Sequence, residues 1–312
     1  MHPMRPERGV TLIELVVTIV VIAIIVTAVA FFLTPLRQST DVAMRAELTD
    51  IADNALQRIG RDVKLALPNS VRTATAGGAH FLEFLPVRTA GRYRAEGGGN
   101  SANDCPADDA ALGTPGNDQI SFDTVDDTCF KSIGKVADAA TIVSGSDRLV
   151  LNNLGSGFPK QDAYELNPAN VALINGVDLA TETNRDRIEF SRPTPFERTL
   201  HDSPGKRFFV VPGRADPVRP VSTVSYACDL ALRTLRRHWG YTPNALPAQT
   251  TVFNDGSSAL IAENVLDCGF DYSNVGPQLN LLTMRLTLQR QRFDGTNETV
   301  SLYHAVHVNN TP

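Results

Sequence analysis

An uncharged apolar run limits what this chain can fold into more than any other feature. The stretch from Leu15 to Leu33 carries no charge, and as a helix it would reach about 29 Å, the hydrocarbon thickness of a bilayer. Arg5 and Arg8 precede it, as in a secretory leader. In such a leader the small residue at the cut follows the apolar region, whereas here Gly9 precedes it. A cut after Gly9 therefore leaves the apolar helix on the mature chain.

One carboxylate, Glu14, lies at the start of the apolar region. The two arginines before it favour a cytoplasmic N-terminus, so the rest of the chain would cross the membrane. An ionised carboxylate at this depth costs several kcal/mol unless it is paired. The amine that a cut after Gly9 creates on Val10 is a suitable partner, on a neighbouring copy or a related subunit. The alternative is a plain membrane anchor in which the glutamate has no role.

The residues around the cut resemble a known processing signal. Arg8-Gly9, an apolar first residue and Glu14 at the fifth mature position are similar to the prepilin signal of type IV pilins and type II secretion pseudopilins. The resemblance implies cleavage between Gly9 and Val10 by a prepilin peptidase and methylation of the new amine. It also implies assembly with other major and minor pilins on an inner-membrane platform. Val10 departs from the phenylalanine that usually begins the mature chain, which bears on methylation and not on cleavage.

Charge and cysteines indicate the compartment. The chain has 312 residues and a formal charge of −5, so no nucleic-acid partner is expected. All four cysteines follow the apolar run, on the side where disulfides persist. Three pairings are possible, and we favour the nearest-neighbour one because each pair then brackets its own segment. It joins Cys105 to Cys129 and Cys228 to Cys268. Zinc is the alternative, but the chain contains no Cys-x-x-Cys spacing.

A second helical half is predicted after the apolar run. Thr34-Pro35 should bend or interrupt the helix, since proline lacks a backbone donor. Beyond it an apolar stripe recurs at three- and four-residue steps until Pro68-Asn69 ends the helix. The stripe consists of Leu48, Ile51, Ala55, Ile59, Val63 and Leu67. We therefore expect a cleaved leader at 1–9, a transmembrane segment at 10–34, an amphipathic helix at 35–68 and an exported β-rich head at 69–312.

The head is predicted to consist of short strands joined by long connections. Strands are expected at 80–85, 148–151, 187–190, 207–211 and 221–227. Residues 282–289 alternate apolar and polar side chains, and Asp294-Gly295 then turns the chain into a returning strand at 299–308. His304 and His307 fall on opposite faces of that strand, which makes them a poor metal pair. A long helix packed on an antiparallel sheet is an α+β fold, and the resemblance also implies a pilin-like arrangement.

Two polar regions each allow a second interpretation. The tract from Ala90 to Asn117 is predicted to be loop, and aspartates crowd in and after it at 104, 108, 109, 118, 123, 126 and 127. They could bind calcium, but without a calcium-loop spacing a solvated acidic loop is the simpler interpretation, and no metal is assigned. Arg233, Arg236, Arg237, His238 and Trp239 could contact DNA, but solvated charges or ion pairs are the simpler interpretation.

The resemblance extends more weakly into the head. Ser225-Tyr226-Ala227-Cys228 and Cys268-Gly269-Phe270-Asp271-Tyr272 are similar to the larger minor pilins of the J/W type. With the amphipathic helix they most resemble the O-type minor pilins of mannose-sensitive haemagglutinin (MSHA) pilus biogenesis. No hydrolase elbow, zinc-protease motif or Walker loop is present, so neither enzyme activity nor a cofactor is expected.

The resemblance implies a minor pilin that promotes filament assembly. Such a subunit starts in the bacterial inner membrane with its head in the periplasm, joins an initiating complex, and remains at the pilus tip on the cell surface. A pseudopilin of a type II secretion system is the first alternative. A tip adhesin is the second, in which the middle of the chain, about 91–204, would bind a surface or a sugar.

Overall fold

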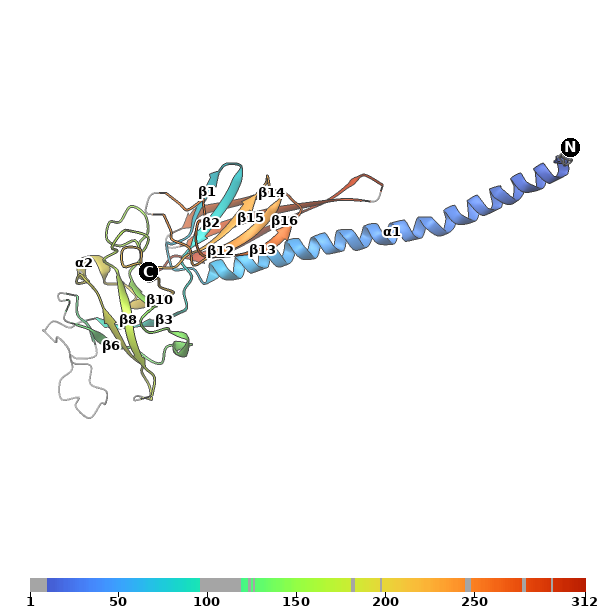
Figure 1. Ribbon diagram of the computed structural model, residues 1–312. Coiled ribbons are helices and arrows are strands. Elements are labelled where there is room, and N and C mark those ends of the chain that lie inside the picture. Colours follow the sequence, from blue (N-terminus) through green and yellow to red (C-terminus); the bar gives the residue numbers. More distant parts are fainter. Residues whose placement is uncertain are drawn as a thin grey trace, which may run out of the picture.

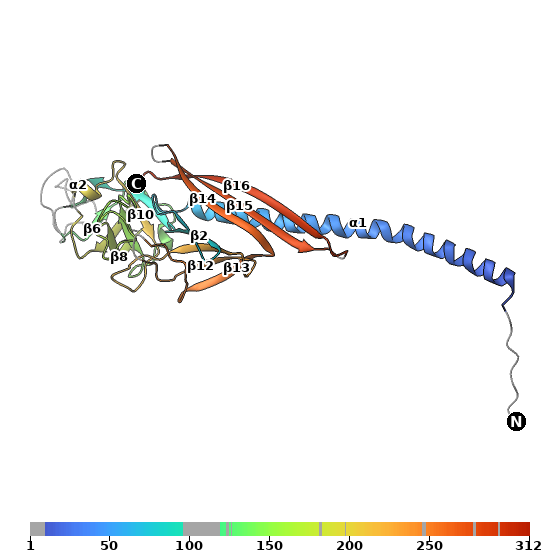
Figure 2. The ribbon, with the colours of Figure 1, turned by 90° about the horizontal axis from the view of Figure 1, so that it is seen from above.

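One long helix and a β-rich head make up the chain (Figure 1). The computed structural model describes residues 10–95, 119–122, 125, 127–180, 183–196, 198–244, 248–276, 279–292 and 294–312. Helix α1 (Leu12–Lys64) carries the head on its C-terminal half, and its N-terminal half projects alone, as Figure 2 also shows. The arrangement is the α+β, pilin-like one expected from the sequence.

Helix α1 is continuous for 53 residues. Of the bend or interruption predicted at Thr34-Pro35, the interruption is absent, because a proline removes one backbone donor without forcing the helix to end. Figure 1 shows a gradual curve instead. The helix also ends earlier than Pro68, because the chain after Lys64 pairs with a neighbouring segment: Leu67 N–H donates to the Leu85 carbonyl at 2.7 Å.

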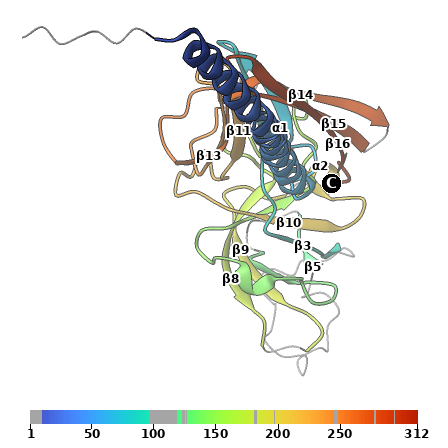
Figure 3. The same ribbon diagram turned by 90° about the vertical axis from the view of Figure 1, so that its right-hand side faces the viewer.

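Two antiparallel sheets flank the C-terminal half of α1, one on either side of the helix in Figure 3. One sheet has the order β1-β2-β11-β12-β13 and the other β14-β15-β16. Their strands are β1 (Arg72–Ala76), β2 (Ala79–Phe84), β11 (Val224–Asp229), β12 (Thr234–Trp239), β13 (Ser257–Glu263), β14 (Val265–Gly276), β15 (Leu279–Gln291) and β16 (Asn297–Asn309). Buried residues of both sheets and of α1 form one core. We call this unit the proximal lobe.

A second unit, the distal lobe, lies beyond the C-terminal end of α1 (Figure 1). Its sheet has the order β3-β10-β7-β8-β9-β6 and its own core, and a parallel pair, β4-β5, lies beside it. The elements are β3 (Thr89–Arg92), β4 (Arg94–Ala95), β5 (Gln119–Ile120), β6 (Cys129–Lys131), a 3-10 turn (Ala139–Thr141), β7 (Arg148–Leu151), β8 (Val171–Asp178), β9 (Arg187–Ser191), α2 (Arg198–His201) and β10 (Arg207–Val211). A third cluster, which includes Leu67 and Tyr164, joins the lobes.

Most of the expected strands are present. The predictions at 80–85, 148–151, 187–190, 207–211 and 221–227 correspond to β2, β7, β9, β10 and β11, and the C-terminal hairpin is β15-β16. The loop prediction is wrong at its start, since β3 and β4 occupy 89–95. Gly91 of β3 makes room for a ring, because a Cβ there would lie 2.6 Å from Phe208 Cζ. Residues 96–118 lie outside the described part of the chain.

Candidate assembly site: the long helix and its contacts with the head

The free end of α1 begins with a side-chain cap. Thr11 precedes the helix in an extended conformation, and its Oγ1 accepts a hydrogen bond from the Glu14 N–H at 3.4 Å. Such a cap satisfies one of the free donors of the first turn. Val10, before it, is exposed. Gly9 lies outside the described residues, so the cut between Gly9 and Val10 stays a prediction.

The first half of α1 presents apolar side chains in every direction. The segment Leu12–Val29 has a mean hydropathy of 3.0 and none of it is buried inside the protein. A helix that is apolar all round needs lipid or other helices to cover it. By length and composition this segment can cross a membrane, and it is also the surface on which neighbouring helices would pack.

Glu14 is exposed within this apolar segment. Leu48, the first fully buried residue of α1 among those described, lies about 50 Å further along the helix. The head is therefore too distant to supply a partner for the Glu14 carboxylate. The predicted pairing with the N-terminal amine of a neighbouring subunit stays a proposal, and the distance between Glu14 and the head is compatible with it.

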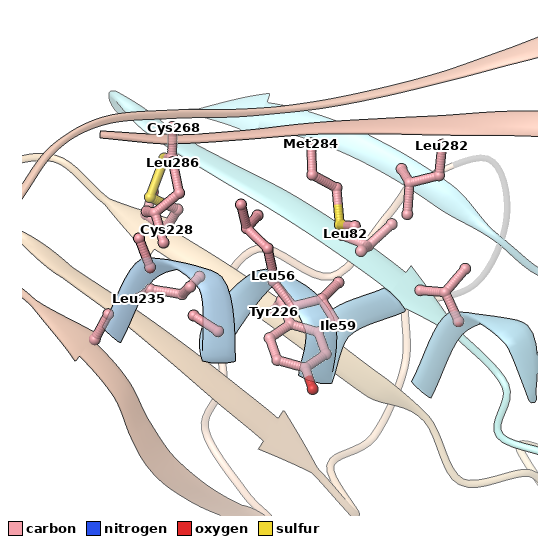
Figure 4. Packing of buried hydrophobic residues seen from close by; sticks show 14 of the residues in the cluster. Leu56, Ile59, Leu82, Tyr226, Cys228, Leu235, Cys268, Leu282, Met284 and Leu286 are labelled. Carbon is pink, nitrogen blue, oxygen red and sulfur yellow. A yellow bond between two sulfur atoms is a disulfide. The ribbon is translucent and has the colours of Figure 1, made fainter. Parts of the chain in front are cut away.

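The second half of α1 buries one face in the head. The predicted stripe is confirmed at Leu48, Ala55, Ile59 and Val63, and Ala52 and Leu56 complete it. Figure 4 shows Leu56 and Ile59 of α1 near Leu82, Tyr226 and Met284 from both sheets. Each large side chain buried this way contributes about 1.5–3 kcal/mol. The helix is thus part of the head's core, so a force on the membrane half reaches the head directly.

Gly60 marks the closest approach between α1 and the C-terminal strand. A Cβ at this position would lie 3.0 Å from His304 Nε2 and 3.1 Å from Val306 Cγ2 of β16. The alternating pattern expected for this strand is confirmed, because His304 and Val306 face α1 while His307 is exposed. This contact was not among the predictions, although a glycine inside an amphipathic helix is a recognised sign of close packing.

Ion pairs connect α1 to the tip of the β15-β16 hairpin. Arg290 Nη1 lies 2.8 Å from Glu47 Oε2. Arg45 approaches Glu298 at 3.8 Å, and Arg292 approaches Asp41 at 3.9 Å. These contacts lie between the membrane half of α1 and its buried stripe. Sequence reasoning missed them, since the partners lie on opposite ends of the chain.

A second polar contact fixes the C-terminal end of α1. Asp62 Oδ2 accepts hydrogen bonds from the Tyr226 hydroxyl at 2.8 Å and from Arg237 Nε at 2.9 Å. Burial, followed by the nearby Asp62 carboxylate, raises the pKa of Tyr226. The phenol therefore stays protonated and donates. Through Asp62 the helix is joined to the central strands β11 and β12 of the five-stranded sheet.

One disulfide joins the two sheets of the proximal lobe. Cys228 of β11 is bonded to Cys268 of β14, with their Cα atoms 6.6 Å apart. This is the second pair of the nearest-neighbour assignment. Cys129 is buried in β6, while Cys105 lies outside the described residues, so the pairing of these two stays a prediction.

The basic cluster, Arg233 and the β12 residues that follow it, makes contacts within the protein. Arg233 Nη2 donates to the Gln289 carbonyl at 3.0 Å and Arg236 Nη2 to Ser258 Oγ at 3.2 Å, while Arg237 pairs with Asp62 as above. The ring of His238 stacks on Phe253 with centroids 4.0 Å apart. Arg237 matches the ion-pair interpretation, whereas Arg233 and Arg236 bond neutral oxygens and keep their charge, which matches the solvated-charge interpretation.

The acidic stretch weighed as a calcium site is mostly beyond the described residues, which exclude positions 104, 108, 109, 118, 123 and 126. Asp127 is described and buried, and its Oδ2 accepts from the Ser121 N–H at 2.6 Å. Within the described part of the chain, no group of three or more His, Cys, Asp or Glu residues could hold a metal. The solvated-loop and calcium interpretations of the remaining aspartates both stay predictions.

Comparison with known proteins identifies the N-terminal segment. The family model described as the prokaryotic N-terminal methylation motif matches residues 4–30. No curated protein and no solved structure matches the chain. The motif and the fold together describe a type IV pilin-like or pseudopilin-like structural component. The motif implies processing by a prepilin peptidase, anchoring in the inner membrane and assembly with pilins.

Proposed function

We propose that this chain is a minor pilin, of the kind represented by the O component of the MSHA system, that promotes assembly of a type IV pilus from its tip. The position of the distal lobe carries the proposal. In a filament of parallel helices, successive subunits are offset along the axis, so the space ahead of each helix belongs to earlier subunits. A lobe beyond the end of α1 (Figure 1) would occupy that space. The tip is the position where the space is free.

The mechanism we propose uses the two halves of α1 differently. The apolar half, Leu12–Val29, packs against the helices of an initiating complex in the membrane. Glu14 pairs with the amine of a neighbouring subunit and so sets the register. The second half is part of the head's core, and the disulfide-linked proximal lobe keeps the head rigid on the helix. The distal lobe then caps the end of the growing filament.

Replacing Glu14 tests the register contact. Glu14→Ala should give a chain that is cleaved and inserted in the membrane but is incorporated poorly into filaments. The measurements are the mature mass, the membrane fraction and the amount of the chain in sheared filaments. Thr18→Ala is the matched control, since it removes a polar side chain from the same exposed apolar segment. Thr18 Oγ1 donates to the Leu15 carbonyl of its own helix, so its loss should not affect contacts between subunits. Normal incorporation of Glu14→Ala would refute the pairing.

Deleting the gene for this chain in the native host distinguishes a role in pilus assembly from a role in type II secretion. Loss of surface filaments with unchanged secreted proteins would support the pilus assembly role. Loss of secreted proteins with filaments intact would assign the chain to the J/W pseudopilins of type II secretion. Complementation with the wild-type chain is the control. A tip adhesin predicts a third result, in which filaments and secretion are both normal and only surface attachment is lost.

A further inference from the structure

A cavity of about 400 Å³ opens on the distal lobe. Its floor is a row across three neighbouring strands, in which Arg148 of β7 is opposite Leu173 of β8, and Leu173 is opposite Ser191 of β9. Side chains of residues directly opposite one another lie on the same face of a sheet. The three residues therefore share the face that the cavity covers.

Two connected loops form the walls. Pro168 lines the cavity from the loop before β8, and Pro217 and Pro220 line it from the loop after β10; Pro193, which follows β9, adds a third proline-bearing segment. The Asn167 N–H donates to the Val218 carbonyl at 2.9 Å, which joins one loop to the other. The second loop is closed at its base by Arg214 N–H, which donates to the Pro220 carbonyl at 2.8 Å, and Asp216 Oδ1 accepts from the Val218 N–H at 2.9 Å. These bonds hold the cavity open without a ligand.

Arg148 supplies a buried positive charge to this site. It is 8% exposed, and its guanidinium donates to the carbonyls of Ser146 at 2.8 Å and Arg214 at 2.7 Å. Carbonyl oxygens satisfy donors but do not neutralise the charge. The adjacent carboxylate, Asp147, is engaged by Arg88 at 2.7 Å. Burial lowers the pKa of Arg148, as expected where water solvates the cation poorly, and the charge of the neighbouring Asp147 carboxylate offsets this only in part.

The other arginine of the lining belongs to the core on the opposite side of the sheet. The Arg192 guanidinium lies over the rings of Phe190 and Phe196, 5.0 and 4.2 Å from their centroids. Arg148 is therefore the charge that faces the cavity. The described residues that line it include no carboxylate. The site thus combines one fixed cation with neutral polar groups and apolar walls.

We propose that this cavity binds a small acidic sugar, whose carboxylate pairs with Arg148. A guanidinium and a carboxylate form charge-assisted hydrogen bonds that strengthen where water is excluded. The volume lies within the range of small-molecule sites and suits one or two sugar rings. Asn167 offers a neutral donor and acceptor to ring hydroxyls, Ser191 Oγ, which donates to Asn175 Oδ1 at 3.2 Å, offers an acceptor, and the proline rings contact the C–H faces. The site lies on the lobe farthest from the membrane half of α1 (Figure 1), where an external sugar can reach it.

Matched ligands test the carboxylate directly. The full chain in detergent micelles is titrated with glucuronate and with glucose, two sugars that differ at the carboxylate, by calorimetry and saturation-transfer NMR. We expect glucuronate to bind at least tenfold more tightly than glucose. Equal binding of the two sugars would overturn the proposal, and so would binding of neither at concentrations up to tens of millimolar.

Variants then locate the site. Leu173→Phe should fill the cavity from its floor and abolish glucuronate binding, and Arg148→Met should weaken binding at least tenfold. Arg187→Met, which removes a half-buried arginine of β9 that pairs with Glu189 and does not line the cavity, is the control and should bind normally. Circular dichroism checks that each variant folds. If Arg148→Met does not fold, Leu173→Phe still tests the location of the site. Undiminished binding by a folded Leu173→Phe chain would place the ligand elsewhere. Filament counts, scored separately, test the proposed assembly function independently.

Discussion

Glu83 of β2 is fully buried, and its charge is balanced within the protein. Arg72 Nε donates to Glu83 Oε1 at 2.6 Å, and the Tyr241 hydroxyl donates to Oε2 at 2.8 Å. The Arg72 guanidinium also lies 3.8 Å from the ring centroid of Tyr164, which precedes β8 of the distal lobe. A single buried ion pair therefore connects the proximal sheet to the junction between the lobes.

Removing the Glu83 carboxylate should destabilise the head strongly. Glu83→Ala leaves Arg72 as an unpaired, largely buried cation, which typically costs about 3–5 kcal/mol. Glu189→Ala, which breaks the more exposed pair between Glu189 and Arg187, should cost about 1 kcal/mol or less. Urea unfolding of the full chain in detergent, followed by circular dichroism, measures both. Similar losses for the two variants would contradict the role of the buried pair.

The close approach at Gly60 leads to a second prediction for a single residue. Gly60→Val should push β16 away from α1, because the first added atom already lies 3.0 Å from His304. Overpacking of this kind costs about 1–3 kcal/mol. Gln57→Val, on the exposed face of the same helix, is the control and should change stability by less than about 0.5 kcal/mol. Thermal melts of the two variants measure these losses of stability, and an unchanged melting temperature for Gly60→Val would refute the packing argument.

Among the elements, the β15-β16 hairpin is the one that follows α1 toward the membrane (Figure 2). Its tip is held by the pairs of Arg290 with Glu47, Arg292 with Asp41 and Glu298 with Arg45. Each is partly exposed on at least one side, so each contributes about 0.2–1 kcal/mol. Their combined effect is on the position of the tip more than on global stability.

Reversing the charge of Arg290 should release the hairpin tip from α1. Arg290→Glu places two carboxylates together, so amides near the tip should exchange hydrogen faster, while the midpoint of global unfolding changes little. Adding Glu47→Arg restores opposite charges and should restore slow exchange. Hydrogen exchange with mass spectrometry on the full chain measures both. If the double variant exchanges as fast as the single one, the ion pair does not hold the tip.

The elements also show what the sequence could and could not predict. The apolar stripe of α1 and the alternation in β15 are local patterns, and each follows from burial on one face. Strand β3 could not be predicted, because its glycine is explained by Phe208, which is distant in sequence. The pair of Arg290 and Glu47 joins residues 243 positions apart, and no local pattern indicates it. The cavity around Arg148 likewise exists only when three strands and three connecting segments come together.

At the scale of the whole molecule, both lobes bury tyrosines. Burial raises the pKa of five of the six: Tyr93, Tyr164, Tyr226, Tyr241 and Tyr272. Tyr93 belongs to the core of the distal lobe, Tyr226 to that of the proximal lobe, and Tyr164 to the cluster between them. Ionisation of these tyrosines at high pH would therefore affect the cores of both lobes and the cluster between them.

The head should unfold cooperatively in alkali. In the unfolded chain a tyrosine ionises near pH 10, whereas the folded chain keeps these protons to higher pH. Because the folded pKa is the higher one, this contribution to stability is complete below about pH 10 and is lost as the pH rises through the folded values. Phenolate absorbance at 295 nm should consequently rise together with the loss of circular dichroism, in contrast to a gradual titration in guanidinium. Ionisation of most phenols near pH 10 with the dichroism unchanged would show that the tyrosines are not protected by the fold.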